Sequence, residues 1–209
     1  LDPGAALDRY PFGPGDVLYV DTGSYFVTNP LGMRLGLVGD ILKSGEPGNP
    51  IRLVGSTNTA AGGSVIQGNP LSSAGFLINE TKHVDLSHLT FIGSSNGLEV
   101  SSAEDINLTW IGARNNVNGF VMNNVISGRF SRAAAWSNQR WGLQVNGAYS
   151  SISWNNGAMF ANVSGGVQHV FGSLQVNNSA FVSAPTNSSV IIEINSSVAG
   201  YAGDHNVYC

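Results

Sequence analysis

The chain has 209 residues, a formal net charge of −4 and a pI near 5.4, and only 11% of its residues are charged. Proteins that bind nucleic acid usually carry a basic surface, and this composition offers none, so we expect no nucleic-acid partner. No apolar run approaches the length of a membrane-spanning helix, so we also expect no membrane span.

The first fourteen residues predict the end of a helix. "AALDRY" (residues 5–10) has the character of a last helical turn, which Pro11 and the turn at 13–15 end. The chain starts at Leu1, and its opening reads as the tail of an element. We therefore expect a short N-terminal cap remnant over residues 1–14, in a fragment of a longer chain with flanking domains.

Residues 15–74 predict irregular coils built from short strands. Four apolar segments have strand character and are bounded by turn residues, glycine above all. They are "GDVLYVDTGSY" (15–25), "LGLVG" (35–39), "IRLVG" (51–55) and "GSVIQG" (63–68). No linker or change of composition separates these segments from the remainder of the chain, so we expect a single domain over residues 1–209.

Residues 75–209 predict regular coils. Gly75, Gly97 and Gly119 open similar segments at steps of 22 residues, and alternation such as V-D-L (84–86) and I-N-L (106–108) is typical of a strand with one buried face. Residue types recur at the same step in an apolar column, Leu86, Leu108, Phe130, Ile152 and Leu174, and in a polar one, Asp85, Asn107, Arg129 and Ser151. A second apolar column, Val84 and Ile106, lapses at Gly128 and Ser150. Because such strands bury a continuous core only when stacked, the repeat predicts an all-β fold, a single parallel β-helix with coils of about 22 residues.

Pairs of asparagines mark the expected turns. Asn tolerates the left-handed backbone conformation that tight turns require. The pairs stand at 115–116, 123–124, 155–156 and 177–178. We therefore expect asparagines to stack on one another at the corners of the coils.

The sequence resembles the right-handed parallel β-helix superfamily, the pectate-lyase-like fold. The likeness is carried by "PGDVLYVDTGSY" (14–25) with the Gly-initiated coils, by "ISWNN" (152–156) and by "DHNVY" (204–208), which are similar to bacterial extracellular members. It implies a right-handed solenoid in a large secreted protein, located outside the cell or on its surface, with polysaccharide as the partner. The fold hosts lyases, hydrolases, epimerases, adhesins and inert stalks, so it does not by itself imply an activity.

Motifs of the enzymes with this fold are missing. The chain lacks the N-T-D, D-D and G-H-G motifs of the hydrolases and the D-P-H-E type motif of the epimerases, and the adjacent Glu104 and Asp105 read as a solvated turn. Lyases of the fold hold calcium with clustered acids, whereas Asp85 has Asn107 and Arg129 as its repeat neighbours. We therefore expect no catalytic residues, no metal and no cofactor. Calcium binding stays open as an alternative, although its three candidate ligands ordinarily cap turns. These are Asp16, Asp21 and Asp40.

One column of large planar or cationic side chains remains. It has the same 22-residue step and consists of His88, Trp110, Arg132 and Trp154. Sugar rings stack on aromatic faces, and arginine offers forked donors to hydroxyls or carboxylates. Facing outward, the column forms a ligand-binding surface; strand alternation from Leu108 instead turns Trp110 inward, and rim packing is a further alternative.

These observations favour a non-catalytic extracellular module that binds polysaccharide. Two alternatives stay open. One is a β-helix polysaccharide lyase or hydrolase whose catalytic residues are non-standard, and the other is a structural stalk or adhesin segment without a ligand. The single cysteine, Cys209, leaves no internal disulfide, which is compatible with a cytosolic protein and with a bacterial secreted protein that has a large core.

Overall fold

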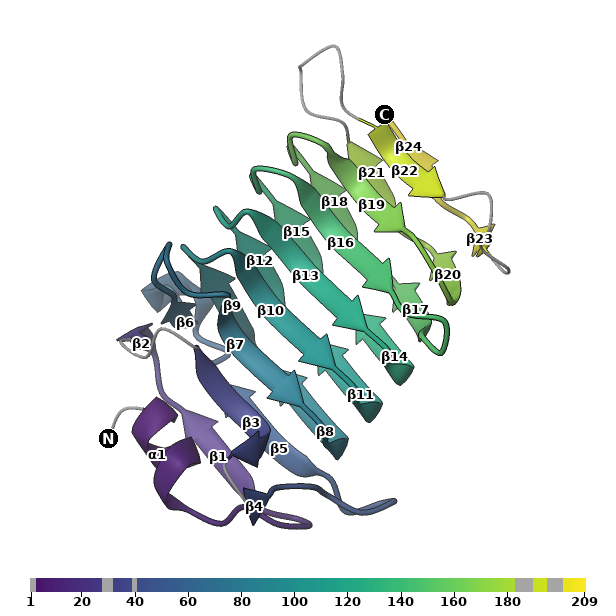
Figure 1. Ribbon diagram of the computed structural model, residues 1–209. Coiled ribbons are helices and arrows are strands. Elements are labelled where there is room, and N and C mark those ends of the chain that lie inside the picture. Colours follow the sequence, from purple (N-terminus) through teal and green to yellow (C-terminus); the bar gives the residue numbers. More distant parts are fainter. Residues whose placement is uncertain (1–2, 28–31, 39–40, 183–189, 195–200) are drawn as a thin grey trace.

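The computed structural model describes residues 3–27, 32–38, 41–182, 190–194 and 201–209 (Figure 1). Within these residues the strands form three eight-stranded sheets, here named A, B and C. Sheet A contains β1 (Val17–Val20), β5 (Ile51–Gly55), β8 (Lys82–Ser87), β11 (Glu104–Thr109), β14 (Ile126–Ser131), β17 (Ser151–Asn155), β20 (Ser173–Asn177) and β23 (Tyr201–Asp204). Sheet B contains β2 (Gly23–Phe26), β6 (Ser64–Gln67), β9 (Leu89–Ile92), β12 (Gly112–Arg114), β15 (Ala134–Trp136), β18 (Ala158–Phe160), β21 (Ala180–Val182) and β24 (Val207–Tyr208). Sheet C contains β3 (Met33–Val38), β4 (Ile41–Leu42), β7 (Ala74–Asn79), β10 (Asn96–Ser101), β13 (Asn118–Asn123), β16 (Trp141–Asn146), β19 (Gly165–His169) and β22 (Val190–Ile194).

The chain visits the three sheets in turn and forms a solenoid. Each regular coil contributes one strand to sheet C, then to A, then to B, and equivalent strands of successive coils pair in parallel. In Figure 1 the front strands run from upper left to lower right while the coils advance from lower left to upper right, which is the right-handed sense. The predicted right-handed parallel β-helix is confirmed.

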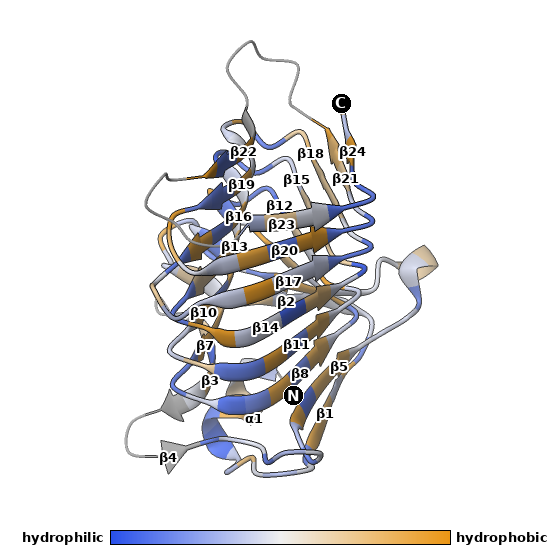
Figure 2. Cartoon of the chain, turned by 90° about the vertical axis from the view of Figure 1, so that its right-hand side faces the viewer, coloured by the Kyte–Doolittle hydropathy of each residue, from blue (hydrophilic) through white to orange (hydrophobic). Residues whose placement is uncertain are grey.

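The core is a set of stacked apolar columns inside the coils. Leu86, Leu108 and Phe130 are register partners in sheet A and are at most 1% exposed. Figure 2 looks onto sheet A, where hydrophobic and hydrophilic positions alternate along the strands. Burying one face of every strand in a common interior is the main favourable term for such a solenoid, because a single coil could not exclude water from its own apolar side chains.

In the regular part, the register departs from the 22-residue step first at the coil that contains β16, and this corrects the predicted columns. Asn116 and Asn138 are 22 residues apart, Phe120 pairs with Leu143 at 23, and Phe130 pairs with Trp154 at 24. One extra residue lies at the start of β16 and another in the turn after it. The apolar column from Leu86 therefore continues through Trp154 and not through Ile152.

Ile152 belongs to the second apolar column. It pairs with Gly128, and its side chain occupies the space that a Cβ at Gly128 would need, at 2.7 Å. The column from Val84 and Ile106 thus lapses only at Gly128 and resumes at Ile152, which is followed by Leu174. The fixed 22-residue step was wrong for this coil, and it was wrong again in the last one, where Val167 pairs with Ile192 and Leu174 with Tyr201.

Asparagines form a buried ladder at the corner between sheets B and C, as expected for stacked turns. Asn138 shows the pattern: its Oδ1 accepts from the main-chain N–H of Asn116 at 3.1 Å, and its Nδ2 donates to the carbonyl of Ala113 at 3.1 Å. Asn162 repeats both bonds one coil further on. The side chains thereby satisfy main-chain groups that the turn leaves without ladder partners.

The N-terminal end carries a short helix, α1 (Pro3–Arg9). Leu7 of this helix is fully buried in the solenoid core, and the amine of the buried Lys43 donates to the Leu7 carbonyl. Burial lowers the pKa of Lys43, against the opposing effect of Asp8. The helical turn expected at residues 5–10 is present, while the division at residues 14 and 74 stays a prediction.

The C-terminal coils are expected to lose stability in mild acid because of His169. Its side chain on β19 is fully buried, its Nε2 lies 3.2 Å from the Gly172 carbonyl, and burial lowers its pKa below 6.5. Between pH 6.5 and that lowered pKa the unfolded chain binds the proton and the folded chain does not, so stability falls as the pH falls, by up to about 1.4 kcal/mol per pH unit. Urea denaturation from pH 7 to 5 should show this slope, and His169→Gln should flatten it. An equal slope in both proteins would contradict the assignment.

Candidate functional site

Three of the four predicted site residues stand at one corner of the solenoid. His88, Trp110 and Arg132 directly follow β8, β11 and β14, each as the first residue of the one- or two-residue turn from sheet A to sheet B. All three have a left-handed backbone, with φ of 57°, 56° and 55°. The main-chain hydrogen bonds between coils continue through these residues; for example, the N–H of Trp110 donates to Ser131 O at 3.0 Å. Because the three corners have the same conformation, their side chains point in the same direction. We call these three residues the ridge.

The ridge side chains stack on one another along the solenoid. The His88 and Trp110 rings are nearly parallel, at 16°, with centroids 6.2 Å apart. The guanidinium carbon of Arg132 lies 5.1 Å from the Trp110 ring centroid, which is cation–π geometry. With centroids 6.2 Å apart, the His88 and Trp110 rings overlap only in part, and the Trp110 residue remains 50% exposed. Trp110 therefore does not point into the core, although strand alternation offered that alternative.

Trp154 does not belong to the ridge. It is fully buried, and its ring centroid lies 4.8 Å from that of Phe130. The two extra residues in the preceding coil put Asn156, with a φ of 54°, at the corner position that the 22-residue step assigned to Trp154. The outward placement of Trp154 was wrong, whereas ligand binding by the other three residues stays a prediction.

A hollow of about 530 Å³ opens beside the ridge. Its lining residues are Trp110, Arg132, Ala133, Ala134, Asn156, Gly157 and Ala158. Arg132 is exposed and forms no ion pair within the described part of the chain. An unpaired guanidinium beside an open floor of small residues can give forked hydrogen bonds to a carboxylate.

A second stack stands opposite, on the outer face of sheet B. Arg114 lies 6.0 Å from the centroid of Trp136, and Trp136 stacks on Phe160 with centroids 5.8 Å apart and planes 14° apart. The outward positions between this second stack and the ridge carry Gly112, which the Trp136 ring covers, and the more open Ala134 and Ala158. We call the space between the ridge and the second stack the trough. The sequence did not predict the second stack as a column, because Arg114 and Trp136 are 22 residues apart but Phe160 follows Trp136 after 24.

The charged side chains on sheet A are paired with one another. His83 Nδ1 lies 2.9 Å from Asp105 Oδ2, and this hydrogen bond together with Arg129 holds the pKa of Asp105 below its usual range. Asn107 Nδ2 donates to Asp85 at 2.8 Å, and Asn107 Oδ1 accepts from Arg129 at 3.1 Å. Polar atoms bound in this way hold the coils together and leave little free for a substrate.

Candidate calcium ligands have ordinary turn roles where the structure describes them. Asp16 accepts from the N–H of Gly13 at 2.9 Å, and Asp21 accepts from the N–H of Thr22 at 2.7 Å. Asp40 lies outside the described residues. Among the residues that are described, no group of three or more His, Cys, Asp or Glu side chains is placed to hold a metal ion.

The fold is shared with pectate lyase Pel9A, although no protein-family model and no curated protein matches the chain. The crystal structure of pectate lyase Pel9A superposes with a TM-score of 0.54 and 16% identity, over 99% of this chain and 71% of that one. The periplasmic alginate epimerase AlgG gives a TM-score of 0.49 with 12% identity, over 94% and 61%, and an alginate lyase from Paenibacillus sp. str. FPU-7 gives 0.44 with 11%, over 98% and 94%. At such identities the likeness establishes the fold alone. No helix in the described part of the chain is long and apolar enough to cross a membrane.

Proposed function

We propose that this protein is a non-catalytic extracellular or cell-surface module that binds an acidic polysaccharide in the trough. The observation that carries the proposal is Arg132, a guanidinium without an ion-pair partner among the described residues, held against half-exposed Trp110 beside a 530 Å³ hollow. Arg114 adds a second cation on the opposite wall, and neither wall contains a carboxylate. The trough therefore suits a chain of uronic acids better than a neutral one.

The shape of the trough supports an extended ligand. The ridge and the second stack each follow several coils, which are spaced about 4.8 Å apart. Two coils span about 10 Å, similar to one disaccharide of an extended glycan. Pectate lyase Pel9A, which has the same fold, is named for a polysaccharide, and this agrees with the class of ligand proposed.

Truncating the ridge should weaken binding without unfolding the protein. We expect Arg132→Ala and Trp110→Ala each to reduce retention on polygalacturonate or alginate by roughly tenfold or more, as for an anchor residue of a binding surface. Their melting temperatures should stay near that of the wild type because both side chains are exposed. Affinity electrophoresis with polymer in the gel measures the retention.

Arg140→Ala is the matched control, because Arg140 is also exposed and without an ion pair in the described residues but lies outside the trough. Arg132→Lys should recover only part of the retention, since an ammonium lacks the planar fork. Unchanged retention in Arg132→Ala and Trp110→Ala would exclude the ridge as the site. Release of unsaturated or reducing products from the same polymers would instead identify a lyase or hydrolase, and absence of any retention would favour a stalk or adhesin segment.

A further inference from the structure

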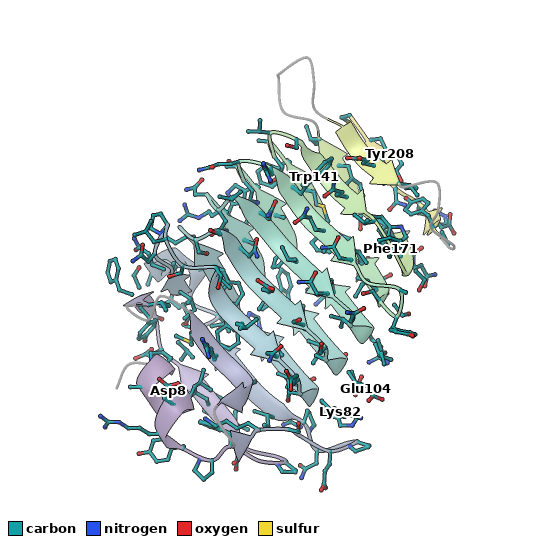
Figure 3. The ribbon with its side chains drawn as sticks, viewed as in Figure 1. Asp8, Lys82, Glu104, Trp141, Phe171 and Tyr208 are labelled. Carbon is teal, nitrogen blue, oxygen red and sulfur yellow. The ribbon has the colours of Figure 1, made fainter. Side chains whose placement is uncertain are left out.

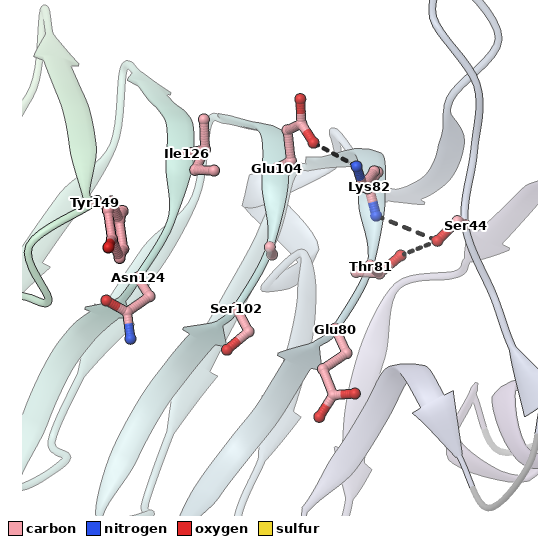
Figure 4. A pocket seen from close by; sticks show the side chains of 10 residues that line it. Ser44, Glu80, Thr81, Lys82, Ser102, Glu104, Asn124, Ile126 and Tyr149 are labelled. Atoms are coloured by element: carbon pink, nitrogen blue, oxygen red, sulfur yellow. Dashed lines mark hydrogen bonds and ion pairs between the residues drawn. The ribbon is translucent and has the colours of Figure 1, made fainter.

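A second hollow lies at a different corner, between sheets C and A (Figure 4). Its volume is about 640 Å³, within the usual range for small-molecule sites. Ser44 lies on one side of it and Tyr149 on the other, with the turns of three successive coils between them (Figure 4). We call this hollow the groove; its floor carries Glu80, Ser102 and Asn124 at the turn and Lys82, Glu104 and Ile126 at the strand starts.

The Tyr149 side of the groove is held by a well-anchored turn. Gly147 has a φ of 92°, and a Cβ there would lie 2.1 Å from Asn124 Oδ1. The buried Ser150 accepts from the N–H of Val125 at 3.2 Å and donates to the Asn146 carbonyl at 2.5 Å. The ring of Tyr149 is nonetheless 77% exposed. An exposed ring on a fixed turn is pre-organised for stacking on a ligand.

The opposite side of the groove is fixed by hydroxyl groups. Thr81 Oγ1 donates to the Lys43 carbonyl at 2.5 Å and lies 3.2 Å from Ser44 Oγ. The main-chain N–H of Lys82 donates to Ser44 Oγ at 3.3 Å, as the dashed lines of Figure 4 mark. The loop that carries Ser44 is therefore tied to the floor of the groove and closes this end.

The charges of the groove differ from those of the trough. The one cation among the described residues that line it, Lys82, is paired with Glu104 at 2.7 Å, and Figure 3 shows the two side chains next to each other at the edge of the solenoid. Glu80 then leaves a net negative charge, so a polyuronate would be repelled. Hydroxyl and amide groups and the free Tyr149 ring remain, beside the half-exposed Ile126.

We propose that the groove is a second carbohydrate site, which binds a short neutral oligosaccharide. The ring of Tyr149 stacks on one sugar, while Ser44, Ser102 and Asn124 supply hydrogen-bonding groups for hydroxyls. The three coils of the floor are separated by two steps of about 4.8 Å, or about 10 Å in all, which is the length of about two sugar residues. This site is separate from the trough and does not depend on the function proposed there.

Titration calorimetry with neutral and acidic trisaccharides tests the groove. The probes are cellotriose, xylotriose and mannotriose, with trigalacturonate as the acidic counterpart. We expect at least one neutral trisaccharide to bind with a dissociation constant on the order of 1 mM or below. Tyr149→Ala should weaken that binding roughly tenfold. Tyr19→Ala is the matched control, because Tyr19 is 75% exposed on β1 and lies outside the groove.

Arg132→Ala separates this proposal from the proposed function. It should weaken trigalacturonate and leave the neutral trisaccharide unaffected, whereas Tyr149→Ala should do the reverse. If none of the three neutral trisaccharides binds, or if Tyr149→Ala leaves their binding unchanged, the groove is not a carbohydrate site. Neither result would contradict the proposal for the trough. Loss of neutral binding in Arg132→Ala would likewise overturn it, by assigning that ligand to the trough.

Discussion

Replacing Trp154 by alanine is expected to lower the free energy of unfolding by about 3–5 kcal/mol, the usual cost of removing a large buried aromatic side chain. Trp154 is fully buried, and its ring lies 4.8 Å from that of Phe130 and 5.9 Å from that of Phe120. The neighbouring strands are fixed by their ladders, so they cannot close the cavity that the indole would leave. Urea denaturation measures the loss.

Two further variants make the Trp154 experiment decisive. Trp110→Ala should cost far less stability, because Trp110 is 50% exposed at the corner. Trp154→Phe should cost less than Trp154→Ala because it leaves a smaller cavity, continues the column of Phe130 and removes a buried Nε1–H that has no partner among the described residues. Equal losses for Trp110→Ala and Trp154→Ala would mean that the two tryptophans do not differ in burial as described.

The second large effect is expected at the asparagine ladder. Asn138→Ala removes the acceptor of the Asn116 N–H and the donor to the Ala113 carbonyl, both of which are buried. Each buried group left without a partner costs about 1–3 kcal/mol, so we expect a loss of about 3 kcal/mol or more. Hydrogen exchange should accelerate first at the amides of residues 113–118, next to the broken bonds.

Asn107→Ala is the control for the ladder. Asn107 also bonds to the coils on either side, through Asp85 and Arg129, but its partners stand on the outer surface of sheet A. Water replaces those bonds, so we expect a loss below about 1 kcal/mol. If Asn138→Ala and Asn107→Ala lower the free energy of unfolding equally, the buried ladder stabilises the fold no more than an exposed hydrogen bond does.

The regular coils could be predicted because their signal is local and repeated. Leu86, Leu108 and Phe130 share one step and one strand pattern, and they are register partners in the structure. Ile152 and Trp154 were misplaced because one residue is added at the start of β16 and one in the turn after it. Neither addition disturbs the alternation of apolar and polar residues in the strand that follows it. The sequence pattern therefore gives no sign that the step has changed.

The sites could be predicted only where they keep that step. His88, Trp110 and Arg132 do so, and the structure brings them together. Phe160 lies two residues beyond the fixed step, and Tyr149 stands in the altered turn itself, so neither could be connected to its neighbours from the sequence. Exposure of Tyr149 depends on the Gly147 turn and the Ser150 anchor, which are three-dimensional features without a repeat.

The altered coil also shows where this protein tolerates inserted residues. The step is 24 between β14 and β17 and returns to 22 between β17 and β20, so the disturbance does not travel beyond one coil. In a stack whose members contact only their nearest neighbours, an insertion is a local matter. The turn at residues 147–149 is thus a natural graft point, where a longer loop or a foreign peptide could be carried by the Ser150 anchor while the coils on either side keep their packing.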